Sequence, residues 1–164
     1  MADGSFSCQS GERGQGKALV EEVTVDSSVL VSALVKGDAF RPVARRVMEK
    51  IFQGHYHAVT SVTVPVEVCG AISKRAGEHK AILAKNQLLK WEKTGLVACS
   101  ELTSHRMEEA AELAIKLRMS GMDAIVVQTA KEKKRALITF DEEMAEKARG
   151  AVKVLTHKDF KNIR

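Results

Sequence analysis

Four acidic residues stand at positions from which their side chains could reach one another: Asp26, Glu67, Asp123 and Asp141. Asp26 and Asp141 each directly follow a short apolar run, rich in β-branched residues, that predicts a buried strand. Glu67 and Asp123 each lie near the start of a predicted helix, among apolar neighbours. In a parallel sheet, strand ends and the starts of the following helices share one edge, where open α/β sheets bind their ligands. We therefore expect the four carboxylates to converge at that edge.

Each of these acids also has a purely structural interpretation. Asp26 and Asp141 could simply be N-caps of the helices that follow them. Glu67 and Asp123 are harder to explain in this way, because an unpaired carboxylate among apolar side chains is costly. No lysine or arginine lies within one helical turn of either residue. A bound cation shared by the four acids is the partner that the pattern favours.

The predicted ligand set consists only of carboxylate oxygens. Hard oxygen ligands suit Mg²⁺ or Mn²⁺, and a magnesium site normally keeps several waters. Open water positions beside a phosphate are what metal-assisted phosphodiester hydrolysis requires.

Histidine and cysteine do not form a competing metal site. His55 and His57 flank a predicted strand without a third ligand, so we expect them to be structural or surface residues. The three cysteines, Cys8, Cys69 and Cys99, are far apart and include no C-x-x-C pair. This spacing argues against a disulfide framework and against a structural zinc site.

Strands and helices alternate along the chain, which predicts one α/β domain with a parallel sheet, helices on both faces and right-handed crossovers. The strands are expected at 23–25, 56–61, 96–99, 136–140 and 152–155. Helical patterns fill the intervals between them, and one further helix is expected from 78 to 93. No element is assigned to the basic tail at 157–164.

Residues 1–20 are rich in glycine and serine at their start, and we expect them to form a mobile extension. Within it, residues 11–17 (GERGQGK) have the spacing of a phosphate-binding P-loop. Ala18 stands where that motif needs a hydroxyl, and no strand precedes it, so we do not expect a P-loop.

The formal net charge is +5, which favours an anionic partner, with nucleic acid first, although such a charge can also serve solubility alone. No apolar run approaches ~20 residues and no signal-peptide pattern is present, so we expect a cytoplasmic protein without membrane contact.

The sequence resembles the PIN-domain nucleases, specifically the VapC-like toxins of toxin–antitoxin pairs. The resemblance covers about residues 22–160 and is carried by four motifs in order: VTVDSSVL, PVEV around Glu67, GMDAIVVQTA around Asp123 and LITFDEEM around Asp141. It implies that residues 21–164 form a PIN-like nuclease domain, with a five-stranded parallel sheet in the order 3-2-1-4-5. The N-terminal extension is unusual for a VapC-like toxin.

The resemblance also implies a site and an activity. Asp26, Glu67, Asp123 and Asp141 would hold one or two Mg²⁺ or Mn²⁺ ions, and a metal-activated water would cleave single-stranded RNA. Ser27, Ser28 and Thr139 match the hydroxyl positions that support the acids. The implied partners are the RNA substrate, a possible cognate antitoxin protein and a second copy in a homodimer.

Two alternatives stay open: an RNA-processing PIN nuclease outside a toxin–antitoxin pair, and a non-catalytic PIN domain that binds RNA or protein. A phosphorelay receiver is disfavoured because it needs an acidic pair where Asp26 stands alone, and a DxD hydrolase because position 28 is serine. RNA contacts are expected from two basic clusters, either of which could instead be a solvated face: Arg41, Arg45 and Arg46, and Lys131, Lys133, Lys134 and Arg135.

Overall fold

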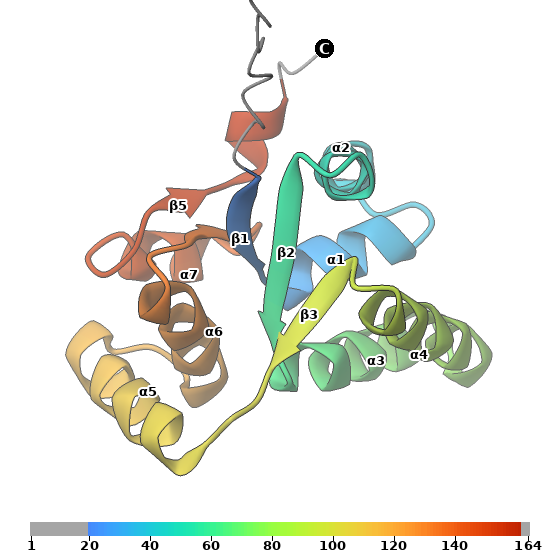
Figure 1. The fold of residues 1–164 in the computed structure, drawn as a ribbon. Helices are drawn as coiled ribbons and strands as arrows, with labels where there is room; N and C mark the ends of the chain where they lie inside the picture. Colours follow the sequence, from blue (N-terminus) through green and yellow to red (C-terminus); the bar gives the residue numbers. More distant parts are fainter. Residues whose placement is uncertain (1–19, 162–164) are drawn as a thin grey trace, which may run out of the picture.

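A five-stranded parallel sheet organises the protein (Figure 1). The computed structural model describes residues 20–161, so the expected mobile extension and the P-loop-like stretch lie outside the described residues, except for Val20. The strands are β1 (Glu21–Val25), β2 (Tyr56–Ser61), β3 (Val97–Ser100), β4 (Ala136–Ile138) and β5 (Val154–Leu155). They lie in the order β3-β2-β1-β4-β5, and every neighbouring pair is parallel. The predicted fold class and strand order are confirmed.

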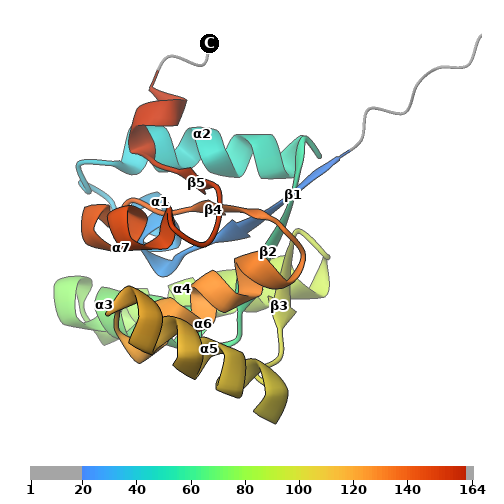
Figure 2. The same ribbon diagram turned by 90° about the vertical axis from the view of Figure 1, so that its left-hand side faces the viewer.

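Helices cover both faces of this sheet (Figures 1 and 2). One face carries α1 (Ser27–Leu34), α2 (Arg41–Phe52), α3 (Thr63–Ala76) and α4 (Glu78–Lys93). The other carries α5 (Ser104–Leu117), α6 (Gly121–Glu132) and α7 (Glu142–Ala148). The chain steps from β1 to β2 and β3 in one direction, and from β4 to β5 in the other. Right-handed crossovers therefore place the two groups of helices on opposite faces, and the direction changes between β1 and β4.

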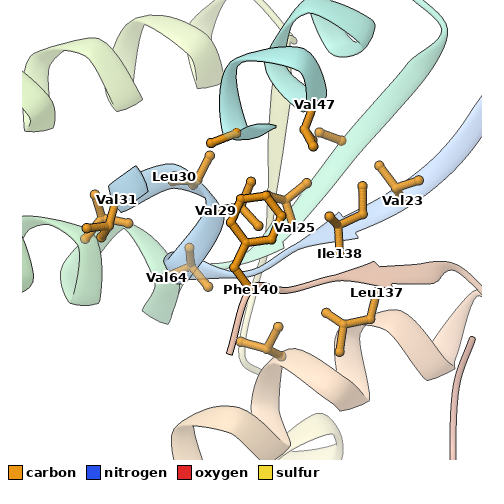
Figure 3. Close-up of a cluster of buried hydrophobic side chains, with 14 of the residues drawn as sticks. Val23, Val25, Val29, Leu30, Val31, Val47, Val64, Leu137, Ile138 and Phe140 are labelled. Atoms are coloured by element: carbon orange, nitrogen blue, oxygen red, sulfur yellow. The ribbon is translucent and has the colours of Figure 1, made fainter. Parts of the chain in front are cut away.

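The core lies on both sides of β1 and β4. Val23, Val25, Leu137 and Ile138 are fully buried, because helices pack against these strands from both faces. Figure 3 shows their side chains in one cluster with residues of α1 and α2. Near-continuous aliphatic strands of this kind are typical of parallel sheets covered on both faces.

The structure corrects several predicted boundaries. β1 begins at Glu21, two residues earlier than expected, because its pairing with β2 extends to Glu21 opposite Tyr56. β4 ends at Ile138 rather than at Phe140, and β5 covers only Val154–Leu155.

The C-terminal segment is also ordered, although the sequence was assigned no element there. Residues His157–Phe160 form a 3₁₀ helix, η1, whose first turn is closed by a capping box between Thr156 and Asp159. Phe160 is 1% exposed. The guanidinium of Arg46 donates to the carbonyls of Phe160 and Lys161 at 3.1 and 2.6 Å. Residues 157–161 are therefore part of the packed domain.

Candidate functional site

Asp26 lies directly beyond β1, at the point where the direction of the chain changes between β1 and β4. Its backbone N–H donates to the carbonyl of Ile138 at 3.0 Å, which continues the β1–β4 ladder by one step. Its side chain is 4% exposed. Oδ2 accepts hydrogen bonds from Ser28 Oγ at 2.6 Å and from Thr139 Oγ1 at 2.9 Å, while Ser27 Oγ lies 3.4 Å from Oδ1. The three hydroxyl groups singled out from the sequence thus all contact this one carboxylate.

Thr139 joins the ends of the two central strands. Its side chain is fully buried. Besides donating to Asp26, its Oγ1 accepts a hydrogen bond from the backbone N–H of Asp141 at 3.1 Å. On the other side of the same junction, Ser28 Oγ accepts from the backbone N–H of Phe140 at 2.9 Å. Two hydroxyls therefore fix the chain around both acids.

Asp141 has the structural role that the sequence left open. Its Oδ1 accepts from the backbone N–H of Met144 at 2.8 Å, so it is the N-cap of α7. Asp26 caps α1 in the same way through Ser28 N at 3.2 Å. Capping does not exhaust either carboxylate, because each uses one oxygen for the cap and Asp141 is exposed to solvent.

Glu67 and Asp123 approach this junction from opposite faces of the sheet, on α3 and α6, and both are half-buried. Burial raises the pKa of Glu67, the charges of Asp26 and Asp123 raise it further, and the Ser27 hydroxyl opposes the rise. Burial also raises the pKa of Asp123; the Ser120 hydroxyl opposes this, and the charges of Asp26, Asp141 and Glu143 add to it. The four acids therefore repel one another through a shared field.

Among residues 20–161, no lysine, arginine or histidine forms an ion pair that would neutralise this field. None of the ion pairs within residues 20–161 involves any of the four acids. The convergence is nevertheless looser than a closed ligand shell: in the described part of the chain, no three histidine, cysteine or acidic side chains are close enough together to hold a metal ion. The donor set is still carboxylate oxygen alone, which fits Mg²⁺ or Mn²⁺, and magnesium sites commonly use one or two protein carboxylates and several waters.

The residues of the two basic clusters differ in their surroundings. Arg46 is held by the carbonyls at the end of η1, as described above. Arg135 pairs with Glu22 at 2.8 Å. Lys133 and Lys134 lie between α6 and β4, hence at the amino end of the strands, whereas the acids lie at the carboxyl end. On α2, Arg45 is exposed.

A hollow of about 350 Å³ opens beside the acids, and it contains a residue that the sequence reasoning missed. Its lining includes Ser27, Ser28 and Asp141 and also Ala71 and Arg75 of α3. Glu67, Ala71 and Arg75 are spaced by four residues, so they follow one face of α3. That spacing was the available signal that Arg75 belongs to the site's surroundings.

Cys69 and Cys99 are free thiols. No helix within residues 20–161 combines the length and apolar character needed to cross a bilayer.

Comparisons with known proteins place this geometry in a family. The sequence model of the PIN domain matches residues 23–150. A comparison with curated protein sequences found no significant match. Among solved structures, the chain is similar to VapC20 of Mycobacterium tuberculosis, described as a sarcin–ricin loop cleaving toxin, with a TM-score of 0.66 and 23% identity over 80% of this chain and 98% of that one. It is also similar to VapBC2 of Rickettsia felis, solved bound to a promoter DNA fragment, with a TM-score of 0.62 and 11% identity over 82% and 98% of the two chains. With four acids at the carboxyl edge of a 3-2-1-4-5 sheet and a family match over most of its length, this chain belongs to the PIN-domain family.

Proposed function

We propose that this protein is a Mg²⁺- or Mn²⁺-dependent endoribonuclease that cleaves single-stranded RNA and acts as a VapC-like toxin. The observation that carries the proposal is the group of four mutually repelling carboxylates at the carboxyl edge of a PIN fold. The pKa values of two of them, Glu67 and Asp123, are raised, and no protein cation among the described residues compensates them. An arrangement of this kind is costly to maintain unless a cation completes it.

Asp26, Glu67, Asp123 and Asp141 would share the metal, some of them through its bound waters, because no three acidic side chains of the described residues are close enough together to ligate one ion directly. When bound, the cation would supply Lewis acidity for phosphodiester hydrolysis. Thr139 and Ser28 orient Asp26, since both donate to its Oδ2 and leave Oδ1 with only a long contact to Ser27. Glu67 and Asp123 bring negative charge from the two opposite faces, so the cation would be held between α3 and α6.

Two similar solved structures and the net charge of the chain support the proposed substrate and biological role. VapC20 is described as a toxin that cleaves the sarcin–ricin loop. VapBC2 is described as bound to a DNA fragment from the promoter of that pair. A net charge of +5 suits an anionic substrate. An antitoxin partner and a homodimer are part of the proposal, and a short overlapping reading frame for a small DNA-binding protein would support the antitoxin.

A second candidate is a PIN domain that binds RNA or protein without cutting. It is favoured by one observation, the absence of a closed group of three metal-binding side chains in the described part of the chain. An RNA-processing nuclease outside a toxin–antitoxin pair would share the chemistry of the first proposal and differ only in its genetic neighbourhood.

The discriminating experiment is cleavage of a labelled pool of mixed single-stranded RNA. The purified protein should cut the pool with Mg²⁺ or Mn²⁺, and EDTA should stop the reaction. Asp123→Asn should be inactive while remaining folded. RNA that is bound but stays intact with either metal would favour the second candidate, and RNA that is neither bound nor cut would overturn both.

A further inference from the structure

Arg75 stands between two hollows on the face formed by α1, α3 and α4, which lie together on one side of the sheet in Figure 1. The acid-edge hollow, described above, reaches Ser27, Ser28 and Asp141. The second, here called the helical hollow, has a volume of about 520 Å³ and is lined by residues of α1, α3 and α4 and of the loop after α1. Arg75 lines both of them, so it marks the passage from the acids to the helical hollow.

The Arg75 side chain is free to bind a ligand. It is 58% exposed, and its one ion pair within the described residues is with Asp38, where Nη1 lies 3.5 Å from Oδ2. A pair of that length and exposure is weak. Asp38 is itself held in place, since its Oδ1 accepts from the backbone N–H of Phe40 at 2.9 Å. Arg75 therefore stays near the hollow while most of its N–H donors remain available.

The charges along this path suit a phosphodiester chain. The lining of the helical hollow includes Lys36, Arg75 and Lys80 and, among the described residues, no carboxylate. Its walls also carry apolar surface, including Leu83, which is 56% exposed. Cations spaced along a groove can hold the phosphates of a single strand. Neither basic cluster singled out from the sequence contributes a residue to either hollow.

We propose that Arg75 binds an RNA phosphate next to the one that is cleaved, and that the strand then follows the helical hollow past Lys36 and Lys80. This inference rests on the proposed nuclease function and specifies how its substrate is held. Arg75 supplies a planar guanidinium whose fork of donors matches phosphate oxygens. A protein partner in the same groove is the alternative occupant. RNA is favoured because Arg75 lines both hollows, and because the charged residues that line the helical hollow, Lys36, Arg75 and Lys80, are all cations.

The test measures steady-state cleavage of a short labelled single-stranded RNA with Mn²⁺ over a range of salt concentrations. Arg75→Ala should raise KM about fivefold, the upper end for an exposed ion pair, with little change in kcat. The slope of log KM against log salt should fall by about 0.7, because one phosphate contact to a single strand is lost. Lys74→Ala is the matched control: it removes a neighbouring exposed cation of α3 that lines neither hollow.

A second variant should change KM in the opposite direction. Asp38→Asn keeps the oxygen that accepts from Phe40 and removes the charge beside Arg75, so KM should fall about twofold. If Arg75 were only a structural partner of Asp38, neither variant would change the salt slope.

The outcomes distinguish a failure of the proposed nuclease function from a failure of the proposed role of Arg75. A parent protein that does not cleave RNA overturns the proposed function and this inference together. A parent that cleaves, with Arg75→Ala behaving like Lys74→Ala, overturns the inference alone and leaves the groove to a protein partner.

Discussion

Replacing Thr139 by valine tests the hydroxyl network that holds Asp26. The substitution keeps the shape of the side chain and removes one hydroxyl, which donates to Asp26 Oδ2 at 2.9 Å and accepts from Asp141 N at 3.1 Å. A hydrogen bond to a charged group contributes about 1.5–3 kcal/mol. Asp141 is exposed, so water can replace the bond to its backbone N–H. We therefore expect Thr139→Val to lower the free energy of unfolding by about 2 kcal/mol.

The matched control is Thr24→Val, in the neighbouring strand β1. Thr24 and Thr139 are both fully buried, but Thr24 Oγ1 has no hydrogen-bond partner within the described part of the chain. Burying an unpaired hydroxyl is unfavourable, so this identical chemical change should be neutral or should stabilise the protein by up to about 1 kcal/mol. The two variants are thus expected to change stability in opposite directions.

Urea unfolding followed by circular dichroism, with EDTA present, measures both effects. Thr139→Ser retains the hydroxyl and should stay closer to the parent than Thr139→Val. In the cleavage assay, Thr139→Val should lose activity because Asp26 is no longer fixed from its buried side, while Thr24→Val should cleave like the parent. Equal destabilisation by both valine variants would show that the hydrogen bonds of Thr139 do not contribute to the free energy of unfolding.

Three further predictions concern other parts of the molecule. Asp123→Asn should leave the metal-free protein at least as stable as the parent near neutral pH, because the pKa of Asp123 is raised by burial and by neighbouring carboxylates; a clear drop in melting temperature in EDTA would contradict this. The pKa of Cys99 is raised to about 11 by burial and by Glu92, so its thiolate is scarce at neutral pH. Its alkylation by iodoacetamide, read by peptide mass spectrometry, should rise about tenfold per pH unit well above pH 8, whereas rapid modification at pH 7 in the folded protein would refute the assignment. Phe160→Ala should cost about 3–4 kcal/mol in urea unfolding because the side chain is buried, and a loss below about 1 kcal/mol would mean that η1 is not firmly packed.

The fold was predictable because its signal is distributed over the whole chain. Strands such as Val23–Val25 are apolar on both faces, helices follow them with periodic apolar residues, and this alternation allows few arrangements. The C-terminal segment lacks such a signal. η1 is a single short turn, and its stability comes from distant partners such as Arg46 and from Phe40, whose ring lies 4.6 Å from that of His157. Long-range packing of this kind leaves no periodic pattern in the sequence.

The site was predictable to the level of topology. Asp26 and Asp141 share an edge because each follows the carboxyl end of a parallel strand, β1 and β4 respectively. Thr139 lies 113 positions from Asp26 in the sequence. Their hydrogen bond depends on the β1–β4 register, which pairs Val25 with Ile138. Arg75 could not be identified from residue type alone, because an exposed arginine near a helix end is common and its place between two hollows exists only once α1, α3 and α4 are packed.

Calorimetric titration of Mn²⁺ into the purified protein measures whether the four acids form one metal site. The parent should bind Mn²⁺, and Asp26→Asn, Glu67→Gln and Asp123→Asn should each weaken binding by at least about tenfold, as expected when one ligand of a shared cation is lost. Asp38→Asn, which lies outside the acid set, should bind like the parent. A parent that binds no Mn²⁺, or acid variants that bind it as tightly as the parent does, would show that the four acids do not form a shared metal site.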